Sequence, residues 1–369
     1  MTEWIECTLD KLGEIVGGAT PSTKCEDYYG GSIPWITPKD LSSFKGRYIT
    51  SGERNITEKG LASCSAQMMP KDAVLFTSRA PIGYVAIASQ SVCTNQGFKS
   101  IVVNEKADPL FVYYLLKYNK DAIEAMGSGT TFKEVSGKTM RAVKVRIPLD
   151  VSYQKRIAAV LDSLDTKIEN NERINDNLQQ QAQAIYSSMF IDNPDPAWSH
   201  GHLSDLITVK YGKDHKKLAD GIYPVYGSGG IMRYVERPLY NKESVLIPRK
   251  GTLNNVMYVN QPFWSVDTMF YTEMKLPNVA KFVYHFVKAK DLASMNAGSA
   301  VPSMTTDILN AMEVVIPSAS ALEEFESLVA PMYEAMEAND VQSKALSQIR
   351  DTLLPKLMSG EIDVSAVQL

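Results

Sequence analysis

A run of forty residues, from Ser152 to Ile191, contains neither glycine nor proline. Within it, apolar side chains recur at alternating steps of four and three, which is the heptad spacing of a helix that buries one seam against a partner. The seam is apolar at both ends and polar in the middle, and it consists of Ile157, Leu161, Leu164, Ile168, Asn171, Asn175, Leu178, Ala182, Ile185 and Met189. The pattern predicts one long helix over residues 152–191.

The same pattern returns 168 residues later, near the C-terminus. The second seam consists of Phe325, Val329, Met332, Met336, Asn339, Ser343, Leu346, Arg350, Leu353 and Leu357. We expect the two helices to pack antiparallel, with Ile157 beside Leu357. The alternative is a pair of unrelated surface helices whose polar positions face water.

In the antiparallel register a polar layer lies at the centre of the predicted interface. Asn171 faces Ser343, and one turn further along Asn175 faces Asn339. A buried polar layer costs stability, but it fixes register and direction because any slip leaves the amides unpaired.

Length and composition are those of an ordinary globular protein, with 369 residues, 44% of them apolar and 22% charged. This length predicts two or three domains. No run of eighteen apolar residues and no secretory signal is found, so we expect a cytoplasmic protein without a membrane span. Cys7, Cys25, Cys64 and Cys93 are predicted to be free thiols, and the four histidines show no metal-binding spacing.

The net charge of −4 is unevenly distributed. Residues 1–150 and 191–317 each carry a slight excess of lysine and arginine, whereas residues 318–369 carry nine acidic residues against three basic ones. A nearly neutral block can still present a local basic face. Charge alone therefore does not establish DNA binding.

The first block, residues 1–151, is predicted to be rich in strands, with apolar runs at 73–77, 84–88 and 98–103 and a helix over 109–126. A loop at 127–138 is rich in Gly, Ser, Thr and Lys, and five basic residues against one acid lie between positions 127 and 146. Such a loop suits phosphate contacts. The alternative is an exposed turn with solvated lysines.

The second block, residues 192–318, repeats the order of the first with little identity. Trp198 and Leu203 correspond to Trp4 and Leu9, and the strand before Arg249 corresponds to the strand before Arg79, which places the two arginines at matching positions. The predicted organisation is a variable block (1–151), a helix (152–191), a second variable block (192–318) and a second helix with a tail (319–369).

The chain shows no catalytic apparatus. No GxGxxG opens a helix, no GxxxxGK[ST] is present, and the amino-methyltransferase box of Asp or Asn, two prolines and an aromatic residue is missing. The nearest match, Asn193-Pro194-Asp195-Pro196, lacks the aromatic residue and is interpreted as a linker.

Several short motifs in a fixed order around two long helices resemble the specificity (S) subunits of type I restriction-modification systems. The motifs are Gly18-Ala19-Thr20-Pro21-Ser22, Ile33-Pro34-Trp35-Ile36-Thr37, Thr94-Asn95-Gln96-Gly97-Phe98, Gly127-Ser128-Gly129-Thr130, Ile147-Pro148, Gln154-Lys155-Arg156-Ile157, Leu161-Asp162-Ser163-Leu164-Asp165, Pro224-Val225-Tyr226-Gly227 and Arg350-Asp351-Thr352-Leu353-Leu354-Pro355-Lys356-Leu357-Met358-Ser359-Gly360-Glu361-Ile362. Each motif is weak alone, and together they span nearly the whole chain.

The resemblance implies an α+β fold: two strand-rich target-recognition domains separated by two long helices that form an antiparallel coiled coil, with a pseudo-two-fold internal repeat. Each domain would read half of a bipartite sequence in double-stranded DNA. The helices would dock two methyltransferase (M) subunits, which bind S-adenosylmethionine, and motor-nuclease (R) subunits would join the complex. The chain itself would bind no cofactor or metal and catalyse nothing. The helical stretch from Ile157 to Met189 spans roughly 50 Å, enough for half-sites about 35 Å apart.

We expect basic and hydroxyl side chains to contact phosphates and a few of them to read base edges. The candidates are Lys24, Lys39, Arg79, Thr130, Lys133 and Lys138 in the first domain, and Lys213, Lys216, Lys217, Arg233, Arg249 and Lys250 in the second. Arg79 and Arg249 are the expected base readers, because each follows a strand in a polar turn. A plain solvated surface role is the alternative for each residue.

Two other functional classes remain at this stage. A self-contained methyltransferase would bind S-adenosylmethionine on the isolated chain. A purely structural coiled-coil scaffold would show no sequence preference on DNA and would not need two Gly/Ser/Lys loops at equivalent places.

Overall fold

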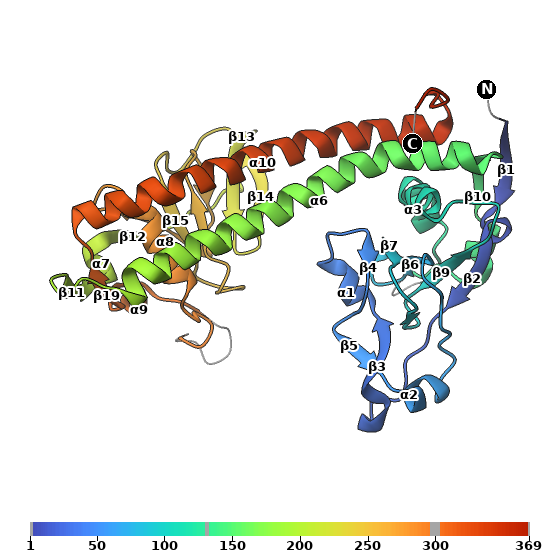
Figure 1. Cartoon of the computed structure of the whole chain (residues 1–369), viewed down its shortest axis with the longest axis horizontal. Coiled ribbons are helices and arrows are strands. Elements are labelled where there is room, and N and C mark those ends of the chain that lie inside the picture. Colours follow the sequence, from blue (N-terminus) through green and yellow to red (C-terminus); the bar gives the residue numbers. More distant parts are fainter. Residues whose placement is uncertain (1–2, 130–132, 296–302, 368–369) are drawn as a thin grey trace. The chain divides into compact units, whose positions relative to one another are not determined.

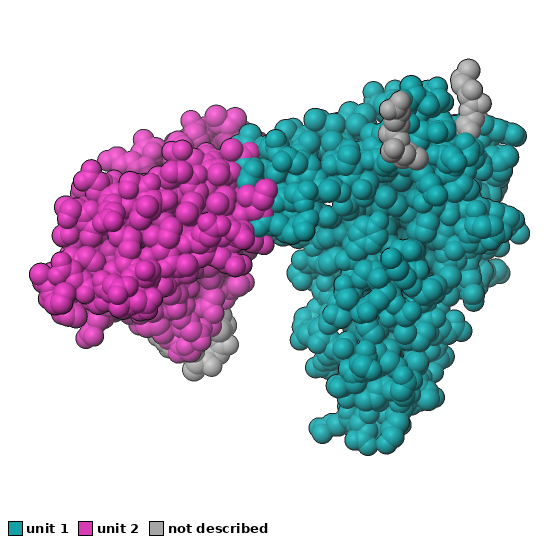
Figure 2. Space-filling model, viewed as in Figure 1, with its two compact units in different colours: residues 1–173, 339–369 teal, residues 174–338 magenta. Residues whose placement is uncertain are grey.

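The structure, a computed structural model, describes residues 3–129, 133–295 and 303–367. It divides into two compact units (Figure 2). Unit 1 comprises Met1–Arg173 and Asn339–Leu369, and unit 2 comprises Ile174–Ala338. Each unit therefore combines a strand-rich block with one part of each long helix.

Unit 1 begins with strands and short helices and continues into the first long helix (Figure 1). Its strands are β1 (Trp4–Thr8), β2 (Gly13–Gly17), β3 (Tyr29–Ile36), β4 (Tyr48–Ile49), β5 (Arg54–Ile56), β6 (Val74–Ser78), β7 (Ile82–Ala88), β8 (Cys93–Thr94), β9 (Lys99–Val103) and β10 (Lys144–Pro148). Its helices are η1 (Leu9–Lys11), η2 (Glu26–Tyr28), α1 (Pro38–Ser42), α2 (Glu58–Ala62), α3 (Pro109–Tyr118), α4 (Lys120–Ala125), α5 (Gly137–Ala142) and the first part of α6 (Val151–Ser187).

Unit 2 follows the same plan after a π-helical turn, η3 (Ser188–Asp192), that ends α6. Its strands are β11 (Ser199–His202), β12 (Ile207–Tyr211), β13 (Asp220–Gly227), β14 (Gly230–Val235), β15 (Ser244–Pro248), β16 (Met257–Val259), β17 (Trp264–Ser265), β18 (Met269–Met274) and β19 (Glu313–Ile316). Its helices are α7 (Leu203–Leu206), α8 (Ala280–Lys288), α9 (Thr306–Asn310) and the first part of α10 (Ala319–Ser359).

The sheets of the two units have the same topology. The order β2-β9-β6 in unit 1 recurs as β12-β18-β15 in unit 2, and the three-stranded sheet β5-β3-β8 recurs as β14-β13-β17. In both three-stranded sheets one partner of the central strand is antiparallel and the other is parallel. The predicted α+β class and the internal repeat are confirmed. Unit 1 has additional elements, α2 and β4, between its copies of these strands.

The cores form where one helix covers the larger sheet. The segment predicted as one helix over 109–126 is two helices, α3 and α4, because Asn119 ends the first and caps the second with a non-helical backbone. In unit 1 six consecutive residues of α3, from Phe111 to Leu116, are buried, and in unit 2 all of α8 up to Val287 is buried. These helices lie between a sheet and the long helices, which explains why they are apolar on more than one face.

The long helices α6 and α10 run antiparallel within each unit, so that the start of α6 meets the end of α10. Ile157, Leu161 and Leu357 are fully buried in one core cluster of unit 1. Phe325 and Val329 are fully buried beside Ala182 in unit 2. The remaining apolar seam positions are half-buried, and these are Leu164, Ile168, Leu178, Ile185, Met189, Met332, Met336, Leu346 and Leu353.

The polar positions of the seam are hydrogen-bonded between the helices. The Asn171 side chain is fully buried, and its Nδ2 donates to Ser343 Oγ (3.1 Å), to Gln342 Oε1 (2.9 Å) and to the carbonyl oxygen of Asn339 (3.3 Å). Asn175 Nδ2 donates to the carbonyl oxygen of Met336 (3.3 Å). These bonds require one particular register of the two helices.

A polar junction joins the three helices of unit 1. Tyr114 of α3 donates from its hydroxyl to Asp165 Oδ2 of α6 (2.8 Å), and Arg350 Nη1 of α10 donates to the other carboxylate oxygen (2.7 Å). The Asp165 side chain is only 8% exposed. Burial and the nearby Asp165 carboxylate raise the pKa of Tyr114.

Unit 2 has a different junction at the same place. His285 of α8 is fully buried, with Nδ1 2.8 Å from Gln183 Oε1 of α6 and Nε2 2.9 Å from the Tyr333 hydroxyl of α10. Because the amide oxygen can only accept, Nδ1 donates and Nε2 accepts from Tyr333, which is the pattern of a neutral imidazole. Burial lowers the pKa of His285 from 6.5 to about 4.

A buried cation fixes each strand-rich block to its long helix. Arg47 of unit 1, whose side chain is 6% exposed, bridges Asp162 (2.5 Å) and Glu169 (3.0 Å) of α6. Lys281 of unit 2, 7% exposed, bridges Glu326 of α10 (2.6 Å) and Glu243 (3.2 Å). Removing either cation would leave carboxylates partly buried and unpaired, so both act as anchors.

Candidate nucleic-acid interface

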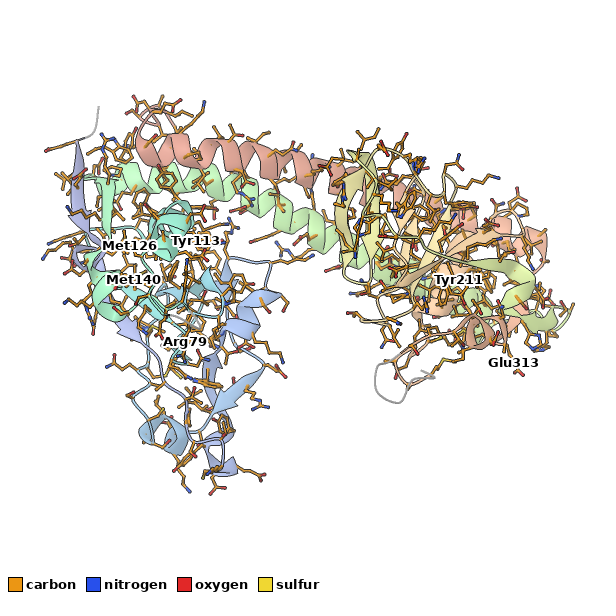
Figure 3. All side chains as sticks on the ribbon, turned by 180° about the vertical axis from the view of Figure 1, so that it is seen from behind. Arg79, Tyr113, Met126, Met140, Tyr211 and Glu313 are labelled. Atoms are coloured by element: carbon orange, nitrogen blue, oxygen red, sulfur yellow. The ribbon has the colours of Figure 1, made fainter. Side chains whose placement is uncertain are left out.

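The basic loop of unit 1 is fixed to the end of strand β6. The backbone N–H of Ser78 donates to the carbonyl oxygen of Gly97 (2.7 Å), and the N–H of Val135 donates to the carbonyl oxygen of Ser78 (2.9 Å). Next to these bonds, the backbones of Arg79 and Glu134 form an isolated antiparallel β-bridge. The structure thereby places Arg79, labelled in Figure 3, against the loop that the sequence predicted as a contact segment.

Glu134 is the acid of this loop, and it is shared by two cations. Arg79 Nη1 lies 3.5 Å from its carboxylate, and Lys99 Nζ at the start of β9 lies 3.7 Å from it. The side chains of Arg141 and Lys99 both lie beside Gly137 of the same loop. One carboxylate among three cations leaves this edge positively charged, and it partly neutralises Arg79.

The other predicted residues of unit 1 are exposed and occupy several elements. Lys24 lies in the turn before η2, and Lys39 of α1 is paired with Glu53 at 2.6 Å. Lys133 and Lys138 are exposed on either side of Glu134. Thr130 lies outside the described residues.

The corresponding edge of unit 2 lies at the end of β15. The N–H of Arg249 donates to the carbonyl oxygen of Thr268 (2.9 Å), and the N–H of Met304 donates to the carbonyl oxygen of Arg249 (2.9 Å). Lys250 and Ser303 form the next bridge. This is the hydrogen-bond pattern found around Ser78 and Arg79 in unit 1.

The side chain of Arg249 lies over an aromatic ring. Its guanidinium carbon is 5.5 Å from the ring centre of Tyr211, and its Nη1 donates to the carbonyl oxygen of Asp267 (3.1 Å). The Tyr211 ring, at the end of β12, packs edge-on against the buried Phe270 with 5.1 Å between centroids. Tyr211, labelled in Figure 3, is nevertheless 53% exposed, so its ring is open to solvent.

The remaining candidates of unit 2 differ in exposure and in their contacts within the unit. Lys213, Lys216, Lys217 and Lys250 are exposed. Arg233 of β14 is bound to Asp220 Oδ1 (2.6 Å) and to the carbonyl oxygen of Leu218 (3.1 Å). Those bonds tie β14 to the segment before β13, which gives Arg233 a role within the unit.

The proposed equivalence of Arg79 and Arg249 is wrong by one residue. The backbone hydrogen bonds place Arg249 opposite Ser78 in the repeat and Lys250 opposite Arg79. The register of the neighbouring strands agrees, because Thr77 pairs with Phe98 where Pro248 pairs with Met269. Side chains alternate in direction along a strand. The two arginines therefore leave their strands at different positions of the repeat.

Two residues of this edge were missed from the sequence, Lys99 and Tyr211. Lys99 pairs with Gly17 across β9 and β2, and Phe270 pairs with Tyr211 across β18 and β12, so the two pairs occupy the same place in the repeat. Each residue lies at the end of a strand, where side chains are open to partners. No spacing rule connects them with Arg79 or Arg249, because the contacts arise from strand pairing over long separations.

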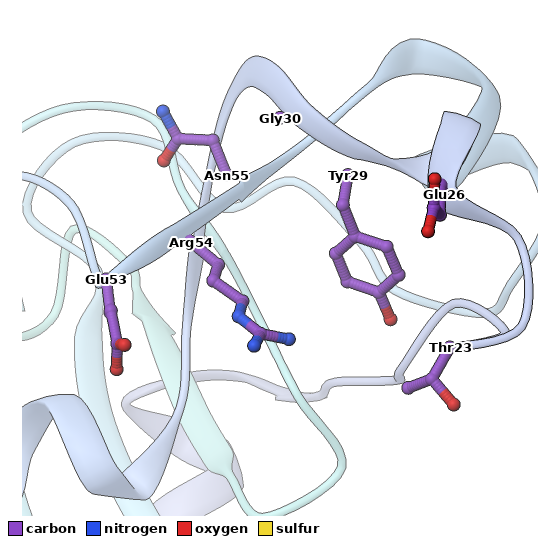
Figure 4. Close-up of a pocket in the computed structure, with 7 residues that line it drawn as sticks. All are labelled: Thr23, Glu26, Tyr29, Gly30, Glu53, Arg54 and Asn55. Atoms are coloured by element: carbon purple, nitrogen blue, oxygen red, sulfur yellow. The ribbon is translucent and has the colours of Figure 1, made fainter.

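A cavity of about 400 Å³ lies on the small sheet of unit 1 (Figure 4). It is lined by Thr23, Glu26, Tyr29, Gly30, Glu53, Arg54 and Asn55. Two carboxylates and one guanidinium give it no excess of positive charge, and none of the predicted DNA-contact residues lines it. This cavity is therefore a poor candidate for a phosphate site.

The described residues also bear on three other expectations. No cluster of three or more His, Cys, Asp or Glu side chains in these ranges could hold a metal ion. Among the helices that the structure describes, none combines the length and the apolar character needed to cross a bilayer. The four cysteines are free thiols, as the sequence predicted.

Comparison with known proteins gives a consistent result. Residues 1–180 and 197–325 match the family described as the type I restriction modification DNA specificity domain. The chain is 32% identical to the type I restriction enzyme MjaIX specificity subunit of Methanocaldococcus jannaschii, over 98% of this chain and 94% of that protein. It is 23% identical to the EcoprrI specificity subunit of Escherichia coli, over 90% and 89% of the two chains. A crystal structure of the type I restriction-modification S subunit from M. genitalium shares the fold, with a TM-score of 0.62 and 19% identity over 97% and 96%.

Two strand-rich units that repeat one topology around a pair of long helices define a two-domain recognition subunit. The chain belongs to the family of type I restriction-modification specificity subunits. The family predicted from the sequence motifs is thus confirmed, and with it the prediction of a specificity subunit.

Proposed function

We propose that unit 1 and unit 2 each read one half of a bipartite target in double-stranded DNA. The observation that carries this proposal is the recurrence of a cationic edge at the same place of the repeat: Arg79 and Lys99 in unit 1, Arg249 and Lys250 in unit 2. In each unit a loop from a distant part of the chain is bonded to the end of a central strand, which holds the cations in place. Fixed cations at a sheet edge suit contacts with phosphates and with base edges.

We further propose that α6 and α10 set the spacing of the units and dock two M subunits. The helices already bury their seam, yet Ile174, Val341 and Ile349 remain 46%, 66% and 48% exposed. Exposed apolar side chains on a pair of helices suit docking of a protein partner. S-adenosylmethionine is expected on the M subunits, and R subunits would join through the complex.

The test of the reading function is co-expression with the neighbouring M subunits and mapping of methylated adenines in genomic DNA. A single motif of two short halves and a fixed non-specific gap is the expected result. Methylation without a motif would contradict the proposal and would support a scaffold instead. S-adenosylmethionine binding by the isolated chain would support a self-contained methyltransferase.

The docking function is tested by co-purification. Val341→Glu introduces a charge on the outer face of α10 and is expected to reduce recovery of the M subunit at least ten-fold. The matched control is Ile222→Glu, which is 77% exposed and belongs to strand β13. Equal recovery with both variants would place the M subunit elsewhere.

A further inference from the structure

We propose that Tyr211 is a positioning residue that holds Arg249 for the recognition of a guanine in the half-site of unit 2. The inference rests on the proposed function and names the residue pair that would give this unit part of its specificity. Three observations on the described residues carry it: the geometry of the pair, its absence from the equivalent place in unit 1, and the lack of a competing carboxylate.

The geometry of the pair fixes the direction of the guanidinium. The carbon centre of Arg249 lies 5.5 Å from the Tyr211 ring centre, and Nη1 is bonded to the carbonyl oxygen of Asp267. The ring is itself held edge-on by Phe270, which is fully buried. A cation over the face of an aromatic ring is attracted by the ring, and its side chain loses rotamer freedom before any ligand arrives.

The equivalent place in unit 1 has none of these groups. Strand pairing places Gly17 where unit 2 has Tyr211, and Lys99 where unit 2 has Phe270. Ser78 stands where unit 2 has Arg249. The scaffold therefore tolerates residues without a ring at this edge, so the stacked pair is not needed to build the fold.

Arg249 also differs from the other arginines of these edges in its charge partners. Arg79 shares Glu134 with Lys99, and Arg233 is bound to Asp220. Within the ranges that the structure describes, no carboxylate is paired with Arg249. Its contacts are with a ring face and a neutral carbonyl oxygen, and neither of these neutralises the cation.

These features favour a guanine as the ligand. The guanine edge in the major groove presents two acceptors, O6 and N7, which match two N–H donors of one guanidinium. With Nη1 bonded to Asp267, the edge formed by Nε and Nη2 supplies two such donors. A phosphate would need only the charge, whereas bidentate recognition of a base needs the orientation that the ring provides.

The experiment uses the full chain co-expressed with its M subunits, with genome-wide mapping of methylated adenine as the readout. The variants are Arg249→Lys, Tyr211→Leu and Tyr211→Phe. Lysine keeps the charge without the fork, leucine packs against Phe270 without a π face, and phenylalanine keeps the ring without the hydroxyl. The control is Arg237→Ala, which removes an exposed arginine of the same unit.

We expect Arg249→Lys and Tyr211→Leu to relax the same single guanine position of one half-site. The discrimination at that position should fall about ten-fold or more. Tyr211→Phe and Arg237→Ala should keep the wild-type motif. This pattern separates positioning from folding, because a loss of folding would lower methylation at every position alike.

The inference is overturned if Tyr211→Leu keeps the full motif, or if Arg249→Lys lowers methylation evenly without relaxing any base. Relaxation of adenine or of both half-sites would equally contradict it. If the wild-type complex shows no bipartite motif at all, it is the proposed function that fails, and the two failures are thereby distinguished.

Discussion

The two units solve the same packing problem with different chemistry. Where three helices meet, unit 1 has a charged junction of Tyr114, Asp165 and Arg350, and unit 2 has a neutral one centred on His285. In both units, one side chain of the shorter helix, α3 or α8, bonds to the long helix that follows it in the chain. A second hydrogen bond of the junction reaches the other long helix. The repeat thus preserves a buried, fully bonded polar link between the helices and not the residues that form it.

This difference predicts different weaknesses. A buried ion pair contributes little net stability, but it is costly to break because it leaves one charge behind. A buried neutral histidine carries no such charge, but it resists protonation. Unit 1 should therefore be sensitive to loss of a partner, and unit 2 should be sensitive to acid.

The largest effect is expected from Arg350→Met. The change leaves the Asp165 carboxylate buried with only the Tyr114 hydroxyl as a donor. The free energy of unfolding should fall by about 3–5 kcal/mol. Chemical denaturation, with hydrogen exchange to localise the change, would measure it.

Two variants control this prediction. Asp165→Asn combined with Arg350→Met removes both charges, keeps an acceptor for Tyr114 and should recover most of the loss. Asp351→Asn removes the second, 66% exposed carboxylate partner of Arg350 and should cost less than about 1 kcal/mol. Protection lost in unit 2 and retained in unit 1 would contradict the assignment of this junction.

The acid sensitivity of unit 2 is the next effect. The pKa of His285 is lowered from 6.5 to about 4 by burial, so the unfolded chain binds a proton more readily than the folded one. The contribution of His285 is complete above pH 6.5 and is lost as the pH falls toward 4. The loss amounts to at most about 3 kcal/mol.

Urea unfolding across this pH window would test the acid effect. His285→Gln cannot titrate, and it should remove this part of the pH dependence while retaining a donor and an acceptor. In unit 1 the equivalent position is Tyr114, so hydrogen exchange in unit 1 should change less over the same window. An unchanged pH profile in His285→Gln would refute the role of this histidine.

A third comparison concerns a tryptophan that occupies different strands in the two units. Trp35 Nε1 donates to the carbonyl oxygen of Ala19 (3.0 Å), and Trp264 Nε1 donates to that of Lys213 (2.8 Å). Trp35 is paired with Cys93 in the parallel bridge, and Trp264 is paired with Val225. The central strand of the small sheet supplies the indole in unit 1, and its parallel neighbour supplies it in unit 2. In both units the indole donates to the equivalent carbonyl oxygen.

Trp35→Val should lower the free energy of unfolding by about 2–3 kcal/mol, through lost packing and the lost hydrogen bond. Adding Cys93→Trp gives unit 1 the arrangement of unit 2 and should recover part of that loss. Cys93→Trp alone should destabilise, because Trp35 then fills the space. Thermal unfolding of the three variants measures the coupling, and simple additivity would show that the two positions do not share one indole site.

The sequence was sufficient to predict features with a repeated pattern. The heptad spacing of Ile157, Leu161 and Leu357 and the apolar runs that became β6, β7 and β9 all reflect one-dimensional periodicity. The turns that contain Arg79 and Arg249 were also predicted to correspond, and the structure confirms this to within one residue. Each of these depends on neighbours that are close in the chain.

What could not be predicted depends on long-range registers. The shift of Arg249 relative to Arg79 follows from hydrogen bonds to Thr268 and Met304, and a one-residue slip reverses the direction of a side chain. The spacing placed Arg350 in the seam, but its partner Asp165 was not predicted, because charged residues on a helix usually face solvent. The Arg47 anchor was missed because its partners Asp162 and Glu169 lie far away in the chain.

The smallest effect would sharpen the contrast between the two cationic edges. Glu134→Gln removes the carboxylate that Arg79 and Lys99 share, and both cations become free for phosphates. We expect the affinity for any duplex to rise about two- to five-fold at low salt. As salt is added, the affinity of the variant should fall more steeply than that of the wild-type complex. Binding of the purified subunit complex to labelled cognate and random duplexes would measure it. Glu361→Gln, which releases Lys356 of α10 in the same unit, is the matched control, because Lys356 is not among the predicted DNA contacts. A gain for cognate DNA alone would mean that Arg79 reads a base, and unit 1 would then resemble unit 2 more than its ion pair suggests. No gain with either DNA would mean that this edge of unit 1 does not face the phosphates.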